Sequence, residues 1–171
     1  RHSLFTMHHA QKRTFKKCAL NNEKHPEGSL ALYTEEYNGY CTGSAANRAS
    51  LKKLIKKGVE YAKSNDLYVI IDWHILSDGN PLKHKKEAKA FFKWTAKAFA
   101  GYDNVIYEIC NEPNGNVTWK QISTYARYII PAIRKYSDGV ILVDTPNWSQ
   151  DSPYLSVNLA SLKHTALPAK I

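Results

Sequence analysis

Residues 105–114 have the sequence VIYEICNEPN, a mainly apolar run that stops at the amide of Asn111 and the carboxylate of Glu112. Pro113 then ends the run as a strand, because proline lacks the N–H that a strand ladder needs and disfavours a helical backbone at the residue before it. In a parallel α/β sheet the C-terminal ends of the strands face the ligand crevice, so polar groups there are in position to do chemistry. Glu112 is therefore the first candidate catalytic residue.

Short apolar runs alternate with longer amphipathic ones on both sides of this stretch, which is typical of repeated βα units with a parallel sheet. The runs predict helices beginning at Asn47 or Ser50, at Asn80-Pro81 and after Thr118, each a residue that favours a helix start. The four expected strands are residues 30–33, 67–71, 105–110 and 140–143. The sequence therefore predicts an α/β fold.

The chain has 171 residues, of which 43% are hydrophobic, so we expect one domain over residues 1–171 with a real core. Residues 1–28 and 163–171 are atypical flanks, because neither shows a clear strand or helix period. The sequence contains no run of eighteen apolar residues and no pattern of a secretory signal. We therefore expect neither a membrane partner nor an intact signal peptide.

Charge and cysteine content exclude several classes of function. The formal net charge is +9, but the lysines are spread over the expected helices and no nucleic-acid motif accompanies them, so no nucleic-acid partner is expected. Cys18, Cys41 and Cys110 are an odd set without close pairing. Their spacing predicts neither a metal site nor a disulfide framework.

Three segments together resemble bacterial endo-β-1,4-glucanases of glycoside hydrolase family five: residues 69–76 (VIIDWHIL), residues 105–115 and residues 148–151 (WSQD). The resemblance extends over residues 30–162. It implies a (β/α)₈ barrel of the TIM-barrel type that is incomplete here, with about half of the barrel, strands two to five, present. It also implies a retaining mechanism with two glutamates, no cofactor, and secretion to an extracellular location.

The resemblance also implies roles for single residues. Glu112 matches the general acid/base, and Asn111 matches the amide that binds the 2-hydroxyl of the transferred sugar. His74 resembles a histidine that lines the same subsite, and Tyr33 resembles the tyrosine at the end of the second strand. Trp148 lies in a loop that often carries an aromatic platform for a glucose ring. The expected partner is therefore a β-glucan such as cellulose.

Two departures from the family pattern concern the second carboxylate, which retaining hydrolysis needs about 5 to 5.5 Å from the acid. An arginine that supports the nucleophile is replaced by Ser29, and the nucleophilic glutamate is expected beyond residue 171. Asp144 is a candidate substitute, although an exposed loop aspartate is its ordinary interpretation. Strand alternation predicts that Glu108 lies on the same side as Glu112 but about 13 Å lower, too far to be a partner.

Simpler interpretations remain open for the same residues. Taken alone, the Asn111-Glu112-Pro113 segment is equally a turn that ends a strand, His74 is a core histidine, and Trp148 covers hydrophobic surface. Glu35 and Glu36 are interpreted as solvated loop charges. At the level of the whole chain, the alternatives to an endoglucanase are a glucan-binding fragment without turnover and an unstable fragment whose open sheet edges self-associate.

Overall fold

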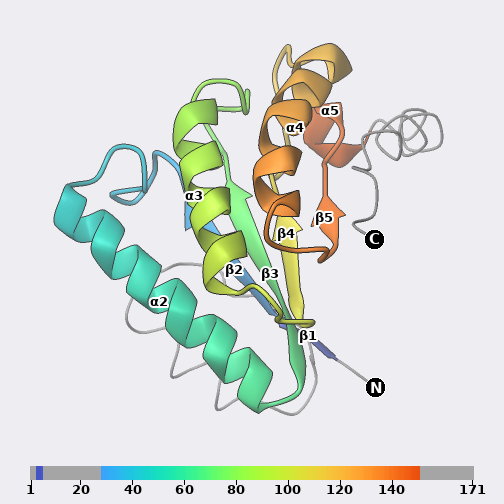
Figure 1. Ribbon diagram of the computed structural model, residues 1–171. Helices are drawn as coiled ribbons and strands as arrows, with labels where there is room; N and C mark the ends of the chain where they lie inside the picture. The colour runs from blue at the N-terminus through green and yellow to red at the C-terminus, as the bar shows by residue number, and fades with distance from the viewer. Residues whose placement is uncertain (1–2, 6–27, 151–171) are drawn as a thin grey trace.

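Five strands form one sheet in the computed structural model, which describes residues 3–5 and 28–150. The predicted alternation of strands and helices is confirmed (Figure 1). The elements in chain order are β1 (Ser3–Phe5), β2 (Gly28–Tyr33), α2 (Ala45–Ser64), β3 (Leu67–His74), α3 (Lys85–Ala98), β4 (Val105–Glu108), α4 (Trp119–Arg134), β5 (Ile141–Leu142) and α5 (Pro146–Ser149).

All strand pairings in the sheet are parallel, as predicted. β3 is central: it pairs with β4 on one side, and β4 pairs in turn with β5. β2 also pairs with β3, and its register ends with Tyr33 opposite His74. β1 pairs with the beginning of β3, at Leu67–Val69. The sequence pattern did not predict β1, because three residues carry too little periodicity to be recognised.

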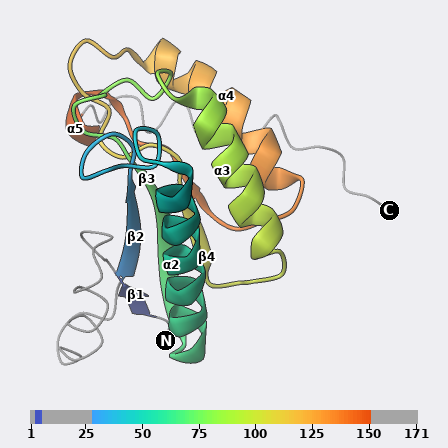
Figure 2. The same cartoon turned by 90° about the vertical axis from the view of Figure 1, so that its left-hand side faces the viewer.

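The helices α2, α3 and α4 lie on one face of the sheet, as the two orthogonal views in Figures 1 and 2 show. Alternate residues of β3 point to that face, and Trp73 packs there against Phe91 and Phe92 of α3, with ring centroids 5.4 and 6.3 Å apart. These three side chains are fully buried, and burial of such rings is the main stabilising contribution to a core. The intervening residues Asp72 and His74 therefore belong to the opposite face of the sheet.

The structure corrects two of the three predicted helix starts. The N-cap of α2 is Ser44, whose hydroxyl accepts from the backbone N–H of Asn47 at 3.1 Å, so neither Asn47 nor Ser50 is the cap. α3 begins at Lys85 rather than at Asn80, because the Asn80 side chain caps a separate turn by accepting from the Leu82 N–H. The predicted cap Thr118 is confirmed, and it forms a capping box with Gln121.

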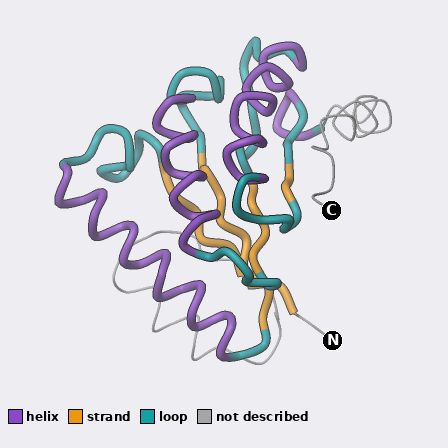
Figure 3. The backbone as a smooth tube through the Cα atoms, viewed as in Figure 1, coloured by secondary structure: helices purple, strands orange, loops and turns teal. Residues whose placement is uncertain are grey.

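Two strands are shorter than predicted. β4 ends at Glu108 instead of Cys110, and β5 consists of Ile141–Leu142 alone. After Glu108 the chain bends, and the buried hydroxyl of Tyr125 in α4 donates to the Ile109 carbonyl at 2.6 Å. The loops that follow β2, β3 and β4 lie together at the C-terminal end of the sheet (Figure 3). No helix in the described ranges has the length and apolar character needed to cross a bilayer.

Candidate active site

Glu112 lies exposed just beyond the end of β4, in the position that the sequence predicted. Its backbone has a φ of 43°, in the left-handed region that non-glycine residues rarely adopt. The Glu112 N–H donates to Oδ2 of Asp144 at 3.0 Å, and the Pro113 carbonyl accepts from the Trp148 N–H at 3.1 Å. The segment that carries the carboxylate is thus held by the loop that follows β5.

The same segment is also held from the opposite side, by β3 and the loop that follows it. The Asn111 N–H donates to the Trp73 carbonyl at 3.2 Å. Asn114 donates through its backbone to Gly79 at 3.2 Å and through its side-chain amide to the Leu76 carbonyl at 3.2 Å. Hydrogen bonds from both neighbouring loops therefore fix the backbone around Glu112, which leaves its carboxylate exposed.

Asn111, the residue before Glu112, is half-buried. Its Nδ2 is buried and makes no hydrogen bond within the part of the chain that the structure describes. A buried N–H donor without an acceptor costs free energy. The amide is therefore poised to stabilise any acceptor that reaches it.

His74 and Tyr33 meet at the ends of two adjacent strands, with ring centroids 4.6 Å apart. The Nδ1 of His74 lies 2.6 Å from Oδ2 of the buried Asp72. Burial alone lowers the pKa of His74, but the hydrogen bond to Asp72 and the charge of Asp72 outweigh it, so the pKa is raised. Burial is the main cause that raises the pKa of Tyr33. Both side chains are buried, with 8% of Tyr33 and 9% of His74 exposed, and the two rings pack together on the β2 and β3 side of Glu112.

Glu108 is a second acidic group near this site, directly opposite Asp72 in the register of β3 and β4. Burial, followed by the charges of Asp72, Asp144 and Glu112, raises the pKa of Glu108 to about 8. Because β4 ends at Glu108, the regular alternation that predicted the separation of Glu108 and Glu112 does not extend to Glu112. The raised pKa favours the protonated form of Glu108, and the charge of Glu112 contributes to the shift.

Trp148 is presented to solvent by α5, a single turn whose backbone is left-handed at Asn147, Trp148 and Ser149. Consecutive non-glycine residues in this conformation are unfavourable. Trp148 is 52% exposed, so about half of the residue is open to solvent. Asp151, the last residue of the WSQD segment, lies outside the described residues.

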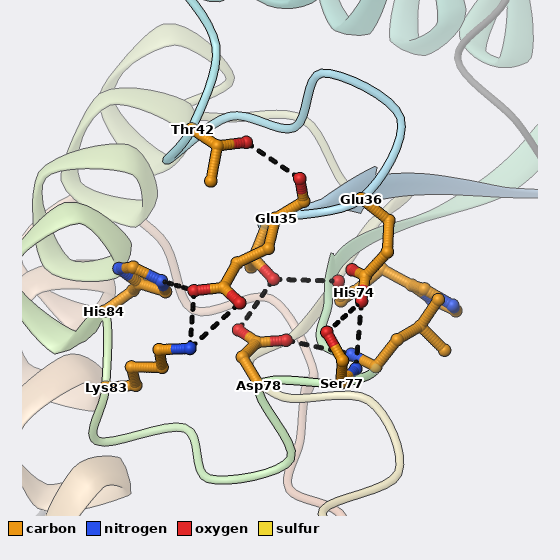
Figure 4. A network of polar contacts seen from close by, with 10 residues as sticks. Glu35, Glu36, Thr42, His74, Ser77, Asp78, Lys83 and His84 are labelled. Atoms are coloured by element: carbon orange, nitrogen blue, oxygen red, sulfur yellow. Dashed lines mark hydrogen bonds and ion pairs between the residues drawn. The ribbon is translucent and has the colours of Figure 1, made fainter.

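Glu35 and Glu36 are not solvated loop charges, which corrects the prediction. Glu35 lies 2.9 Å from the Lys83 ammonium and 2.6 Å from Nε2 of His84, and these hydrogen bonds lower its pKa. Glu36 accepts from the backbone N–H and the hydroxyl of Ser77 (Figure 4). Both glutamates therefore tie the loop after β2 to the loop after β3.

The same network contains three possible metal ligands, the side chains of Glu35, Asp78 and His84, whose ligand atoms lie within 4.8 Å of one another. Asp78 is buried and accepts from the Thr34 hydroxyl at 2.7 Å. The Lys83 ammonium already supplies a cation to Glu35. We therefore interpret the cluster as an ion-pair network.

Sequence reasoning missed the bracing residues Asn114 and Asp78, because each bonds to a residue of another loop. It also missed Asp72, although its partner His74 lies in the same strand. For Asp72 a signal existed, namely its position two residues before His74 in a strand, which puts both side chains on one face. Asp144 does contact Glu112, although through the backbone N–H. Cys41 and Cys110 are free thiols, and Cys18 lies outside the described residues.

Comparison with known proteins supports the resemblance. The family model described as cellulase (glycosyl hydrolase family 5) matches residues 29–168. The chain is 49% identical over 122 residues to endoglucanase A of Butyrivibrio fibrisolvens and 47% identical over 123 residues to an endoglucanase of Clostridium saccharobutylicum. Each match covers 71% of this chain but only 28% and 26% of the relative, so the chain spans about a quarter of their length.

Solved structures give the same result for the fold. The catalytic domain of Thermobifida fusca endoglucanase Cel5A superimposes with a TM-score of 0.67 at 36% identity, covering 84% of this chain and 45% of that one. A variant of that domain in complex with cellotetraose gives a TM-score of 0.71 at 34% identity, covering 94% and 50%. These neighbours are (β/α)₈ barrels, and the parallel sheet with its helices corresponds to part of such a barrel. The chain belongs to the cellulases of glycosyl hydrolase family 5.

Proposed function

We propose that this chain is a portion of a catalytic domain that hydrolyses internal β-1,4-glucosidic bonds of cellulose or a related β-glucan, with retention and with Glu112 as the general acid/base. The observation that carries the proposal is the exposed carboxylate of Glu112, held at the C-terminal end of β4 by hydrogen bonds from both neighbouring loops. Membership of family 5 and the endoglucanase relatives support it.

In this reaction Glu112 protonates the departing oxygen while a second carboxylate, about 5 to 5.5 Å away, attacks the anomeric carbon. Glu112 then takes a proton from the water that hydrolyses the glycosyl intermediate. Two carboxyl groups suffice for this chemistry, so we propose that no cofactor takes part. The Oδ2 of Asp144 already accepts from the Glu112 N–H and the Ser149 hydroxyl. We therefore assign Asp144 to bracing the acid rather than to attack, and none of the described residues is assigned as the attacking carboxylate.

The neighbouring side chains are proposed to bind the sugar. Asn111 donates its buried amide to the 2-hydroxyl after a small rotation, which satisfies a donor that otherwise lacks an acceptor. His74, oriented by Asp72, and Tyr33 line the same subsite. The exposed ring of Trp148 stacks on a glucose unit on the other side of Glu112.

The proposed partner is a β-glucan chain, and the proposed location is outside the cell. A homologous catalytic domain in complex with cellotetraose supports a β-glucan ligand. Because cellulose is an insoluble polymer, an enzyme that cuts its internal bonds meets its substrate only outside the cell. Detection of the protein in the culture medium rather than in washed cells is the result expected.

The proposal is tested by the release of reducing ends from carboxymethyl-cellulose by this chain, by its Glu112→Gln variant and by a Glu87→Gln control. Glu87 is exposed on α3 and lies in none of the contacts described above. Removal of a general acid lowers rates by about 10² to 10⁴-fold, so we expect that loss in Glu112→Gln and none in the control.

Three outcomes separate the functions. Equal rates for the wild-type chain and Glu112→Gln would rule out Glu112 as the acid. Binding of cello-oligosaccharides without release of reducing ends would favour the second candidate, a glucan-binding function without turnover, for which the exposed Trp148 is the supporting observation. Neither binding nor release would overturn both.

A further inference from the structure

Tyr37 is the most exposed large hydrophobic side chain in the described part of the chain, at 66%. It lies in the loop between β2 and α2, where its φ is 55° and that of Asn38 is 61°. A bulky side chain in the left-handed region is disfavoured by steric contact with the backbone, and such strain clusters at ligand-binding sites. The loop thus keeps a tyrosine ring in solvent at a conformational cost.

The position of this ring connects it to the candidate active site. Tyr37 makes an edge-to-face contact with Tyr33 at 5.2 Å, and Tyr33 makes one with His74 at 4.6 Å. Along the sheet, β3 is followed by β4 and then by β5; Glu112 lies in the loop after β4, and Trp148 lies after β5. Tyr37 and Trp148 therefore belong to opposite sides of Glu112, and Tyr37 lies at the outer end of the row that begins at His74.

The backbone that precedes Tyr37 is held by the loop network of Figure 4. Glu35 is bound by Lys83 and His84 through its carboxylate, and its carbonyl accepts from the Thr42 hydroxyl at 2.8 Å. Glu36 is bound by the Ser77 backbone N–H at 3.0 Å. A ligand that meets a ring already held in place pays little for ordering it.

The loop is also closed on its other side, at Gly39. A Cβ at this residue would lie 2.4 Å from the Thr34 carbonyl oxygen, so only glycine allows the close approach. The Tyr40 N–H donates to the Tyr33 carbonyl at 2.8 Å across the same turn. The path of the chain through Tyr37 is therefore fixed by contacts at both of its ends.

We propose that Tyr37 is a further sugar-binding platform, which stacks on the pyranose ring of a β-glucan unit beyond the one next to His74. This inference rests on the proposed function. The C–H face of a glucose ring is apolar and matches the face of an aromatic ring, while the hydroxyl groups at its edge stay in water. Only a glucan chain long enough to reach past Tyr33 makes this contact, so Tyr37 favours longer substrates.

The test measures the affinity for cellobiose and for cellohexaose by isothermal titration calorimetry. The full chain carries Glu112→Gln, so that the sugars are not cleaved during the measurement. Adding Tyr37→Ala is expected to weaken cellohexaose binding about tenfold, or about 1.4 kcal/mol, and to leave cellobiose binding within about twofold. Tyr37→Phe keeps the ring and is expected to keep the affinity. Tyr128→Ala, an exposed ring on α4, is the matched control and is expected to change neither.

Three other results would contradict the role proposed for Tyr37. Unchanged cellohexaose binding in Tyr37→Ala would overturn the platform and leave the proposed function standing. Equal losses for cellobiose and cellohexaose would also overturn it, because they would mean that Tyr37 supports the loop rather than an outer sugar. Binding of neither sugar by the parent Glu112→Gln chain would overturn the proposed function and the platform with it.

Discussion

At the scale of single residues, Glu112 is held through its backbone, while its carboxylate stays exposed. Its left-handed φ is a conformation that persists only where the surroundings determine it, and here Asp144, Trp73 and Gly79 supply the surroundings. The sequence predicted the position of Glu112 because an apolar run, a carboxylate and a proline follow one another. It did not predict the bracing partners, since they depend on where two other loops fold.

Asp72 and Glu108, two of the acidic groups near Glu112, have different surroundings. Asp72 lies beside His74, a group that becomes cationic on protonation, whereas the main influence on Glu108 is burial, which favours the protonated form. The protonated form of Glu108 reduces the negative charge facing Asp72, Asp144 and Glu112. The titration of Glu108 therefore makes the stability of the protein depend on pH.

Glu108 is predicted to make the protein less stable as the pH rises. Its pKa is raised from 4.5 to about 8, so between these values the folded chain keeps a proton that the unfolded chain has released. The stabilisation is therefore complete below about pH 4.5, declines as the pH rises, and is lost above about pH 8. In Glu108→Gln this decline is absent, so the free energy of unfolding of the variant rises relative to wild type across that range.

Urea denaturation of the wild-type chain, Glu108→Gln and the exposed Glu87→Gln at pH 5, 7 and 9 measures this difference. A difference between Glu108→Gln and wild type that stays constant with pH would contradict the assignment. Glu87→Gln is expected to follow the wild-type curve.

At the scale of elements, the helix α4 contacts the chain immediately after β4. Tyr125 is fully buried in α4, and its hydroxyl donates to the Ile109 carbonyl immediately after the strand. The chain then turns into the segment that carries Asn111 and Glu112. The apolar period of residues 105–110 predicted a longer strand, because a sequence period does not reveal that a tyrosine from another element takes one of its carbonyl groups.

Removing that hydroxyl is predicted to affect both stability and the site. Tyr125→Phe leaves a buried carbonyl without its donor, which costs roughly 1 to 3 kcal/mol of unfolding free energy. Because the freed carbonyl lies three residues before Glu112, the rate of reducing-end release should fall as well. Tyr128→Phe on the same helix is the control, and a loss no larger in Tyr125→Phe than in this control would show that the bond does not set the position of the acid.

The start of α4 was predicted correctly, whereas the starts of α2 and α3 were not. Thr118 is followed by Gln121 at the spacing of a capping box, a local signal that the structure confirms. Ser44, Asn47 and Ser50 are all residues that favour caps, but the cap is Ser44, and the Asn47 side-chain amide instead donates to the Asn38 carbonyl. That contact joins two parts of the loop and leaves no trace in a local pattern.

At the scale of the whole molecule, apolar core residues and the polar groups of the candidate site lie on opposite faces of the sheet. Its helix-covered face holds Trp73 with the phenylalanines of α3, and its opposite face and C-terminal end hold the polar groups near Glu112. The alternation of short apolar and long amphipathic runs was enough to predict the parallel α/β arrangement. The network of Glu35 and Glu36 was not predictable, because charges in a loop look alike whether they are solvated or paired.

Self-association through open sheet edges stays a prediction for the whole chain. Within residues 28–150, β5 pairs only with β4, and Val140 beside it is 57% exposed. Exposed strand edges favour pairing with another chain. Sedimentation velocity is expected to show a species larger than 19.4 kDa that increases with concentration. A single monomeric species with a cooperative thermal transition would contradict this prediction.

The central claim is that Glu112 donates a proton to the leaving oxygen, and its most direct test compares two leaving groups. The dinitrophenolate of a dinitrophenyl β-cellobioside departs without protonation. The sugar oxygen that leaves when a glucan is cleaved needs a proton. Glu112→Gln is therefore expected to lose about 10² to 10⁴-fold in glucan cleavage but to keep the initial burst of dinitrophenol near the wild-type rate. An equal loss on both substrates, or no loss on either, would contradict the claim.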